Sequence, residues 1–179
     1  MAINPSDVMF SDAVKATQTR LGSRSMFEKR EGPGGWNHAV TADLIGFLET
    51  IATCYIATAT ASGQPYIQHR GGPPGFLRPL DEATIGFADF AGNKQYITAG
   101  NLTENDRVCL FLMDYQAKRR VKVWGTARAV EGDSDLITRL MPEDYRARPE
   151  RVILITVYAW DINCSQHIPQ MFHAGDVAN

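Results

Sequence analysis

Hydrophobic residues recur every three or four positions over residues 6–21 and again over residues 41–51, which is the spacing of helices with one buried face. The pattern predicts a helix over residues 6–21, with Ser6 as its N-cap and Gly22 just beyond its end. A second helix is predicted to begin at Thr41, whose hydroxyl group can cap it. The buried face of this second helix is expected to comprise Leu44, Phe47, Leu48 and Ile51.

The segment between these two helices is rich in residues that favour loops. Residues 30–36 read REGPGGW, with three glycines and one proline. We therefore expect residues 1–40 to form a helical arm and loop that lies across the rest of the domain or across a partner subunit. The whole chain, residues 1–179, is predicted to be one domain, because its length suits a single hydrophobic core.

From residue 54 onward the hydrophobic period changes to two, the period of β-strands. The run CYIATATA leads through Ser62 and Gly63 into PYIQHR, which is typical of a β-hairpin. Further strands are predicted at residues 84–90, 108–115, 121–130 and 151–160, and short helices at residues 96–104 and 134–141. Most connections are too short for a parallel crossover, so we predict a mainly β (α+β) fold, an antiparallel six-stranded barrel with flanking helices.

The last predicted strand contains the run VILITVYAW, residues 152–160, which is apolar on both faces. One face can pack on the barrel core, whereas the other needs a different cover. A second subunit could provide this cover, which favours a homodimer.

The composition is that of an ordinary globular protein, with 44% hydrophobic and 21% charged residues. The net charge of −2 creates no global field that would attract nucleic acid or an anionic membrane. The longest apolar run, Val152 to Trp160, is well short of the roughly 20 residues that a membrane-spanning helix needs. Three cysteines, far apart and odd in number, cannot form a fully paired disulfide framework. We expect a soluble cytoplasmic protein without nucleic-acid or membrane partners.

The loop at residues 68–78, QHRGGPPGFLR, has the residue types of an anion site. Its glycines let a planar ligand or a phosphate approach the backbone N–H groups, and Arg70 or Arg78 can bind an anion through several donors. The same residues are also typical of a surface turn with solvated arginines. Both interpretations stay open from the loop alone.

A second candidate segment, residues 89–108, passes from a strand through Gly92, Asn93 and Lys94 towards a short helix. A helix N-terminus presents free N–H groups and a positive dipole end, which favours phosphate, and Lys94 adds a charge. The alternative is an ordinary connection in which Asn93 serves as the N-cap.

Two further segments combine charge with aromatic residues. In residues 115–125 strand alternation places Arg120, Lys122 and Trp124 on one face, which suits a flat anionic ligand or is simply a solvated charged face. Residues 158–173 end in polar and aromatic groups that can contact a ligand edge. We expect no metal there, because Cys164, His167 and His173 match no standard zinc pattern.

Three runs in a fixed order carry a family resemblance: DFAGNKQYITAGNLTENDRVCLFLMDY, KRRVKVWGTARAVE and VYAWDINCSQHI. Over about residues 40 to 170 the chain resembles the pyridoxamine 5'-phosphate oxidase-like, FMN-binding split-barrel superfamily. It is most similar to the related members and not to the oxidase itself. The resemblance implies a split barrel that forms a homodimer with FMN at the subunit interface.

The resemblance also implies which residues contact the cofactor. The phosphate is expected at Arg70 or Arg78, together with Asn93 and Lys94. The isoalloxazine ring or its ribityl chain is expected near residues of three strands, and a last group of contacts from the other subunit. The implied ring contacts are Gln68, His69, Arg70, Gly71, Gly72, Phe90, Arg120 and Lys122, and those of the other subunit are Trp160, Gln166 and His167.

The chain departs from the oxidases at two motifs. It has HRGGPPGFLR and GNKQYIT where oxidases have an Arg-x-Val-Leu-Leu-Lys type strand and a Ser-Arg-Lys type helix start. The oxidase run that binds the vitamin B6 phosphate is also absent, so that reaction is not expected.

The resulting hypothesis is an FMN-dependent oxidoreductase that transfers hydride or electrons between a reduced donor and a small-molecule acceptor. The donor is expected to be a nicotinamide nucleotide or another small organic molecule, and no side chain is predicted as a catalytic acid, base or nucleophile. One alternative is a non-catalytic flavin carrier or redox sensor. Another is the same fold with a deazaflavin or haem, with His69 or His167 near the haem.

Overall fold

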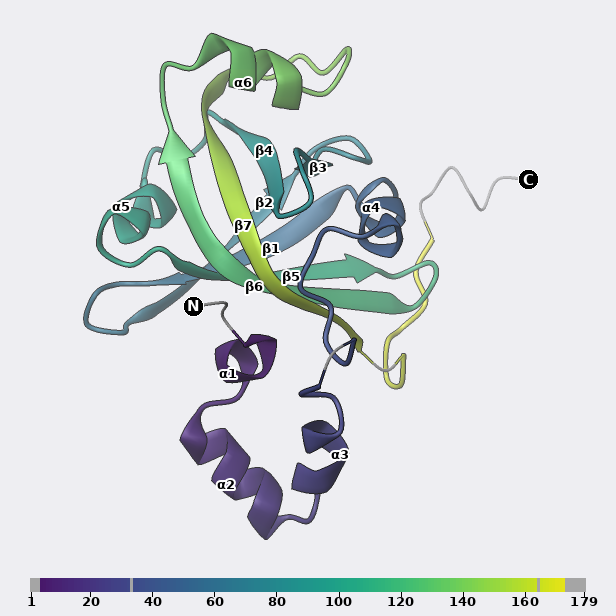
Figure 1. Ribbon diagram of the computed structural model, residues 1–179. Coiled ribbons are helices and arrows are strands. Elements are labelled where there is room, and N and C mark those ends of the chain that lie inside the picture. Colours follow the sequence, from purple (N-terminus) through teal and green to yellow (C-terminus); the bar gives the residue numbers. More distant parts are fainter. Residues whose placement is uncertain (1–3, 33, 164, 173–179) are drawn as a thin grey trace.

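The computed structural model describes residues 4–32, 34–163 and 165–172. Cys164 and His173, which the sequence analysis considered as metal ligands, lie outside these residues. The described chain forms a mainly antiparallel β-structure with helices around it, and a separate group of short helices at the N-terminus (Figure 1).

Seven strands form one antiparallel sheet in the order β2-β1-β5-β6-β7-β4-β3. The strands are β1 (Thr53–Ala59), β2 (Pro65–Gly71), β3 (Arg78–Pro79), β4 (Thr84–Phe90), β5 (Arg107–Asp114), β6 (Arg119–Val130) and β7 (Pro149–Asn163). The six predicted strands are confirmed. The additional strand, β3, has only two residues, Arg78 and Pro79, and pairs with β4. Such a short pairing produces no detectable period in the sequence.

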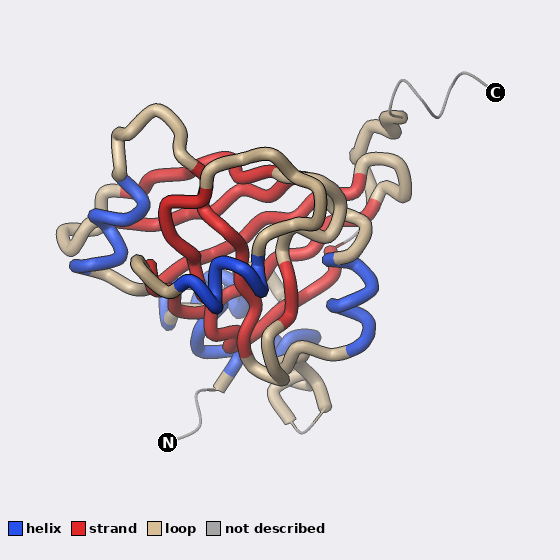
Figure 2. The backbone as a smooth tube through the Cα atoms, turned by 90° about the horizontal axis from the view of Figure 1, so that it is seen from above, coloured by secondary structure: helices blue, strands red, loops and turns tan. Residues whose placement is uncertain are grey.

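The sheet curls so that strands from its two ends approach each other. β2 is the first strand in the sheet order and β4 is next to last, yet Arg70 Nε of β2 lies 3.1 Å from Asp89 Oδ1 of β4. No ladder joins β2 to β4 in the sheet order. The result is a barrel with a split between these strands, and Figure 2 shows its strands wrapped around one centre with helices at the edges.

Strand alternation fills the barrel interior as the sequence predicts. Along β6, Val121, Val123 and Ala127 are buried, whereas Arg120 and Lys122 lie on the outer face. The helix α4 (Ala42–Leu48) packs its predicted face against this core. The α4 residues in the core are Leu44, Phe47 and Leu48, followed by Ile51 after the helix.

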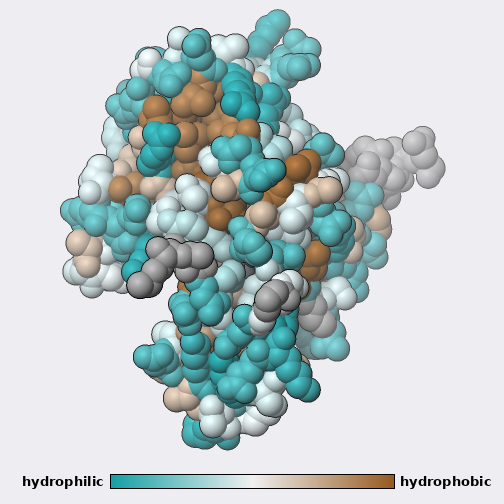
Figure 3. All heavy atoms as spheres, in the orientation of Figure 1, coloured by the Kyte–Doolittle hydropathy of each residue, from teal (hydrophilic) through white to brown (hydrophobic). Residues whose placement is uncertain are grey.

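The second apolar face of β7 is covered within the same chain. Val152 and Leu154 of β7 pack with Leu140 of α6 (Ser134–Leu140) in a smaller hydrophobic cluster. Figure 3 shows hydrophobic side chains gathered below α6, where β6 and β7 curve towards that helix. This part of β7 therefore needs no second subunit, which corrects the argument for a homodimer from the apolar strand.

The N-terminal arm contains three helices where one helix and a loop were predicted. The predicted helix over residues 6–21 is divided into α1 (Pro5–Met9) and α2 (Asp12–Arg20), and α3 (Arg24–Glu28) lies in the predicted loop. The division occurs because the Ser11 hydroxyl accepts a hydrogen bond from Val14 N and caps α2. Ser6 is not the N-cap of α1, because Asn4 has that position and accepts from Ser6 N.

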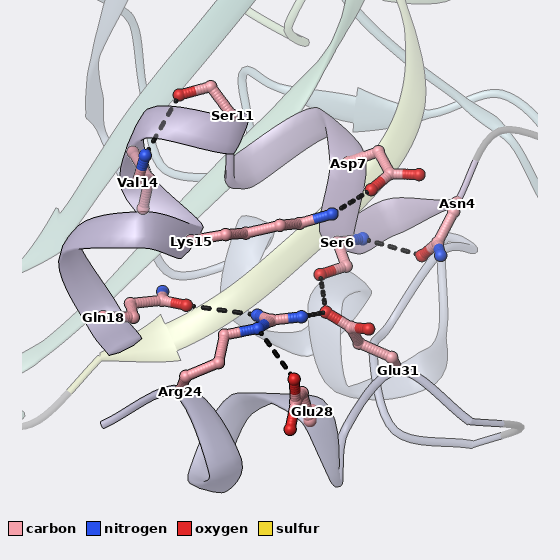
Figure 4. Close-up of polar contacts among 10 residues, drawn as sticks. All are labelled: Asn4, Ser6, Asp7, Ser11, Val14, Lys15, Gln18, Arg24, Glu28 and Glu31. Atoms are coloured by element: carbon pink, nitrogen blue, oxygen red, sulfur yellow. Dashed lines mark hydrogen bonds and ion pairs between the residues drawn. The ribbon is translucent and has the colours of Figure 1, made fainter. Parts of the chain in front are cut away.

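A polar network holds the three arm helices together (Figure 4). Arg24 of α3 pairs with Glu28 in its own helix and with Glu31, and it donates a hydrogen bond to Gln18 of α2. Ser6 of α1 donates to the same Glu31 carboxylate at 2.8 Å. The arm is therefore assembled around one carboxylate and one guanidinium group, and its surface is mostly hydrophilic (Figure 3).

Aromatic side chains and one arginine connect the arm to the barrel. Phe10, Phe27 and Trp36 pack on one another, with ring centroids 5.2 to 6.5 Å apart. The Arg30 guanidinium lies 3.7 Å from the centroid of the Trp36 ring and donates to Asp161 Oδ1 of β7 at 3.0 Å. The predicted arm and loop thus lie against the end of β7 in the same chain.

The other predicted helices are present, with differences at their first residues. α4 follows Thr41 as predicted, but the Thr41 hydroxyl group makes no capping hydrogen bond. α5 (Ile97–Glu104) follows Tyr96, which has a left-handed backbone with φ of 54°. Among the described residues, no helix combines the length and the apolar character needed to cross a membrane.

Candidate functional site

The split between β2 and β4 contains a cavity of about 260 Å³. Its walls come from the end of β2, the end of β4, the loop before α5, the first turn of α5 and the beginning of β7. The lining residues are Gln68, His69, Arg70, Asp89, Phe90, Gly92, Asn93, Lys94, Tyr96, Thr98, Ala99 and Glu150. We call this space the split cavity.

The split cavity brings together the two segments that the sequence analysis treated as separate phosphate sites. Arg70 comes from the first segment, and Asn93 and Lys94 come from the second. Gln68, His69 and Phe90, also predicted as contacts, complete this group. The curling of the sheet explains the meeting, because it brings the end of β2 beside the end of β4.

The two glycines that follow Arg70 have a packing role and do not line the split cavity. A Cβ on Gly72 would lie 2.7 Å from Phe76 Cβ, and one on Gly71 would lie 3.2 Å from Ala52 O. Gly72 N also donates a hydrogen bond to Ala52 O at 3.0 Å. Close packing against the buried Phe76 therefore accounts for glycine at position 72.

Charged groups are paired at the floor of the split cavity. Asp89 lies between two arginines, with Arg70 Nε 3.1 Å from Oδ1 and Arg151 Nε 3.7 Å from Oδ2. Arg151 also pairs with Glu150 at 3.2 Å and with Glu131 at 3.0 Å. Burial raises the pKa of the Asp89 carboxyl, and the charges of the two arginines oppose this rise.

Arg70 retains donors for a ligand. Its Nε atom is buried, and although it is close to Asp89, it makes no hydrogen bond of good geometry. Its Nη1 atom donates only a long hydrogen bond, 3.5 Å, to His69 O. Lys94 is exposed at the rim of the same cavity. The donors of Arg70, Asn93 and Lys94 therefore fit an anionic group such as a phosphate.

The loop before α5 does not have the N-cap that the sequence suggested. Asn93 is not the N-cap of α5, because its Oδ1 accepts from Gln95 N, and Tyr96 has the N-cap position before the helix begins at Ile97. Lys94 and Tyr96 have positive φ angles of 60° and 54°, which cost energy for residues other than glycine. Thr98 Oγ1 donates to Gln68 Oε1 at 2.7 Å and ties α5 to β2.

A larger cavity of about 710 Å³ shares one lining residue, His69, with the split cavity. Its wall includes Tyr55, whose ring lies 5.7 Å from the His69 ring in an edge-to-face arrangement. The C-terminal segment closes one side, where Met171 N donates to Tyr115 O in the β5–β6 turn. The other residues in this wall are Thr50, Ile51, Ala52, Thr53, Met113, Asp114, Gln116, Ala117 and Phe172.

Besides the two glycines, six of the predicted contact residues lie outside the split cavity. Arg78 donates to Arg139 O at the end of α6, and Trp160 is only 2% exposed and donates through Nε1 to Ala39 O in the core. The outer face of β6 holds Arg120 and Lys122. The remaining two, Gln166 and His167, follow β7 and do not line the split cavity.

Asp89 and Arg151 are site residues that were not predicted from the sequence. The two are directly paired in the β4–β7 ladder, and Arg151 is buried, with 8% exposure. The signal in the sequence was Asp89 as the one charged residue of β4 and Arg151 directly before the apolar run of β7. Their pairing depends on the strand register, which the sequence does not reveal.

A third cavity, of about 640 Å³, lies between α1 and the outer face of the sheet. Val8 of α1 lines it, as do Cys109, Trp124 and Tyr158 from three strands. Burial raises the pKa of the Cys109 thiol. Within the described residues, no group of three or more His, Cys, Asp or Glu side chains is arranged to hold a metal ion.

Comparisons with known proteins agree with this architecture. The family model described as pyridoxamine 5'-phosphate oxidase matches residues 41–164. The chain therefore belongs to the pyridoxamine 5'-phosphate oxidase family, and its fold is the antiparallel split barrel of that superfamily. No curated protein matches the sequence.

Solved structures share the fold at low sequence identity. HupZ of Group A Streptococcus aligns with a TM-score of 0.55 and 17% identity over 74% of this chain and 98% of its own. A putative pyridoxamine 5'-phosphate oxidase from Lactobacillus delbrueckii aligns with a TM-score of 0.53 and 18% identity, over 70% of this chain and 95% of its own. An FMN-binding protein from Syntrophomonas wolfei aligns with a TM-score of 0.52 and 14% identity, over 86% of this chain and 96% of its own.

Proposed function

We propose that this protein binds FMN and acts as an oxidoreductase between a reduced donor and a small-molecule acceptor. The observation that carries the proposal is the meeting of Arg70, Asn93 and Lys94 at the split cavity, beside a larger aromatic cavity that shares His69. A polar chamber next to an apolar one matches a cofactor with a phosphate at one end and a planar ring at the other. The FMN-binding protein of similar fold supports the choice of cofactor.

In this proposal Arg70 and Lys94 bind the phosphate through charge-assisted hydrogen bonds, and the Asn93 side chain lies beside them. The flavin would supply the hydride chemistry, and the chain would supply orientation and electrostatics. Thr98 holds Gln68, and Tyr55 packs on His69, so both β2 side chains are oriented before a cofactor arrives. Either a nicotinamide nucleotide or another small organic molecule serves as the donor.

We further propose a homodimer through the outer face of β1, β5 and β6. This face carries partly exposed apolar side chains, including Tyr55, Phe111 and Trp124. The register places Tyr55 opposite Phe111 and Cys109 opposite Trp124, so these side chains form a continuous surface. A second copy covering it would also bury Cys109, which is a free thiol. Free thiols at Cys54 and Cys109 suit the cytoplasm, which we propose as the location.

The cofactor proposal is tested by titrating the purified protein with FMN and with riboflavin, which lacks the phosphate. Flavin fluorescence reports both affinities. We expect FMN to bind at least about tenfold more tightly, because a charge-assisted phosphate contact contributes on the order of 1.5–3 kcal/mol. Arg70→Gln should remove this preference.

Arg78→Gln is the matched control, because Arg78 is an arginine of the same loop segment whose side chain points to Arg139 O. It should leave the FMN preference unchanged. A wild-type protein that binds neither flavin would refute the proposal. Bleaching of bound FMN by NADH or NADPH, followed by reoxidation in air, separates an oxidoreductase from a flavin carrier, which would not bleach.

The proposed dimer is tested separately. Light scattering at several protein concentrations measures the mass, and a monomer would refute the dimer.

A further inference from the structure

Asp89 presents a negative charge to a cavity that is proposed to bind an anion. Its side chain is 14% exposed and lines the split cavity with Arg70 and Lys94. A buried carboxylate repels a phosphate bound next to it. Its presence at an anion site therefore points to another role for this side chain. The surroundings of Asp89 indicate what that is.

The two oxygens of Asp89 face arginines from two different strands. Oδ1 lies 3.1 Å from Arg70 Nε, and Oδ2 lies 3.7 Å from Arg151 Nε. Both contacts are made on the Nε side of the guanidinium group. For the two terminal nitrogens of Arg70, the only hydrogen bond among the described residues is the long one from Nη1 to His69 O.

Arg70 has few other restraints. It lies on β2 at the split, where no ladder connects β2 to β4. A long side chain at such an edge loses rotamer entropy when it is fixed by a ligand. An ion pair across the split fixes the side chain before the ligand arrives, so the entropy is lost on folding and not on binding.

Arg151 supplies the charge that makes this arrangement tolerable. It is buried behind Asp89, pairs with Glu150 at 3.2 Å, and its guanidinium carbon lies 5.0 Å from the Tyr96 ring centroid. Arg151 also pairs with Glu131 at 3.0 Å, so it offsets the charge of Asp89 only in part. Arg70, Lys94 and Arg151 carry three positive charges against the two carboxylates that line the cavity, Asp89 and Glu150, so a net positive charge remains for an anion.

We propose that Asp89 is a positioning residue, which acts through Arg70 and aims its terminal nitrogens at a phosphate group in the split cavity. This inference rests on the proposed phosphate site and adds a residue that does not itself touch the ligand. The expected effect on affinity is opposite to that of charge alone. Removing a negative charge from an anion site should tighten binding if charge alone matters, whereas loss of positioning should weaken it.

The test compares Asp89→Ala with wild-type protein in FMN and riboflavin titrations. We expect Asp89→Ala to weaken FMN binding by about tenfold, the scale of one charge-assisted contact, and to leave riboflavin affinity within about twofold. In an Arg70→Gln background the same change should have no further effect, because Asp89 acts through Arg70. A general structural defect would lower both flavin affinities.

Glu150→Gln is the matched charge control, because Glu150 lines the same cavity and pairs with Arg151 instead of Arg70. It should bind FMN at least as tightly as wild type. If Asp89→Ala does not fold, Asp89→Asn replaces it, since it keeps the shape and loses the ion pair. Its FMN affinity should also fall while riboflavin affinity stays the same.

Tighter or unchanged FMN binding in the Asp89 variant would overturn the inference, as would equal losses for FMN and riboflavin or additive losses with Arg70→Gln. If wild-type protein does not bind FMN, the proposed function fails, and inorganic phosphate becomes the probe. Phosphate would then be titrated while the Arg70 side-chain NMR signal is observed. Weaker phosphate binding in Asp89→Ala supports the inference, and absence of phosphate binding to wild type overturns it.

Discussion

Two glycine-to-alanine substitutions should change the stability of this protein in opposite directions. Gly125 lies in β6 where the register against β7 shifts, and a Cβ there would lie 1.9 Å from Thr156 O. The clashing atom belongs to the backbone of the neighbouring strand, so no side-chain rotation can relieve the contact. Gly46 lies in α4, and a Cβ at that position meets no atom within 4 Å.

The magnitudes follow from these contacts. Overpacking in a core costs about 1–3 kcal/mol and occasionally more, and a clash with backbone in the middle of a ladder lies at the upper end. Gly125→Ala should therefore lower the free energy of unfolding by about 3 kcal/mol or more. Gly46→Ala should raise it by about 0.5–1 kcal/mol, because alanine restricts the unfolded chain and favours the helix.

Urea unfolding followed by far-ultraviolet circular dichroism measures both variants against wild type under the same conditions. The two midpoints should move to opposite sides of the wild-type midpoint with little change in slope. If the free energy of unfolding of Gly125→Ala is within about 1 kcal/mol of the wild-type value, β6 and β7 do not approach as closely at the bulge as the structure shows.

Three further substitutions test other parts of the structure. Trp160→Phe removes the N–H group that bonds Ala39 O, and urea unfolding should show a loss of about 1–3 kcal/mol; no loss would contradict that bond. Burial raises the pKa of the Cys54 thiol to about 12, whereas the thiol in the unfolded chain has a pKa of about 8.5. The contribution of the neutral thiol to the free energy of unfolding is therefore complete below about pH 8.5 and declines as pH rises towards 12. Between pH 8 and 10 the free energy of unfolding should therefore fall less steeply for Cys54→Ala than for wild type. An equal pH dependence of the two proteins would refute this linkage. Arg24→Met should open the arm, so limited proteolysis should cleave between α2 and α3 sooner while the barrel remains intact; unchanged cleavage would contradict the network around Glu31.

Much of the barrel could be predicted because its strands alternate clearly. The pattern in β6 placed Val121 and Val123 inside and Lys122 outside, as observed. The arm was harder, since a single apolar stripe runs across residues 6–21 and hides the competing cap at Ser11. Helix α3 has no buried residue, so it lacks the hydrophobic signal on which the prediction depends.

The candidate site was predictable in its segments and not in its pairings. Arg70 and Arg78 are equivalent by composition, and only the curl of the sheet places Arg70 beside Lys94 and sends Arg78 towards α6. The partnership of Asp89 with Arg151 depends on the β4–β7 register. Local patterns therefore indicated the chemistry, while long-range strand pairing determined which residues meet.

The most direct test of the account is a crystal structure of the protein with FMN. The phosphate should lie in the split cavity within hydrogen-bond distance of Arg70 and Lys94, with the isoalloxazine ring directed towards His69. A phosphate bound at Arg78 or on the Arg120 face of β6, with the split cavity empty, would contradict it.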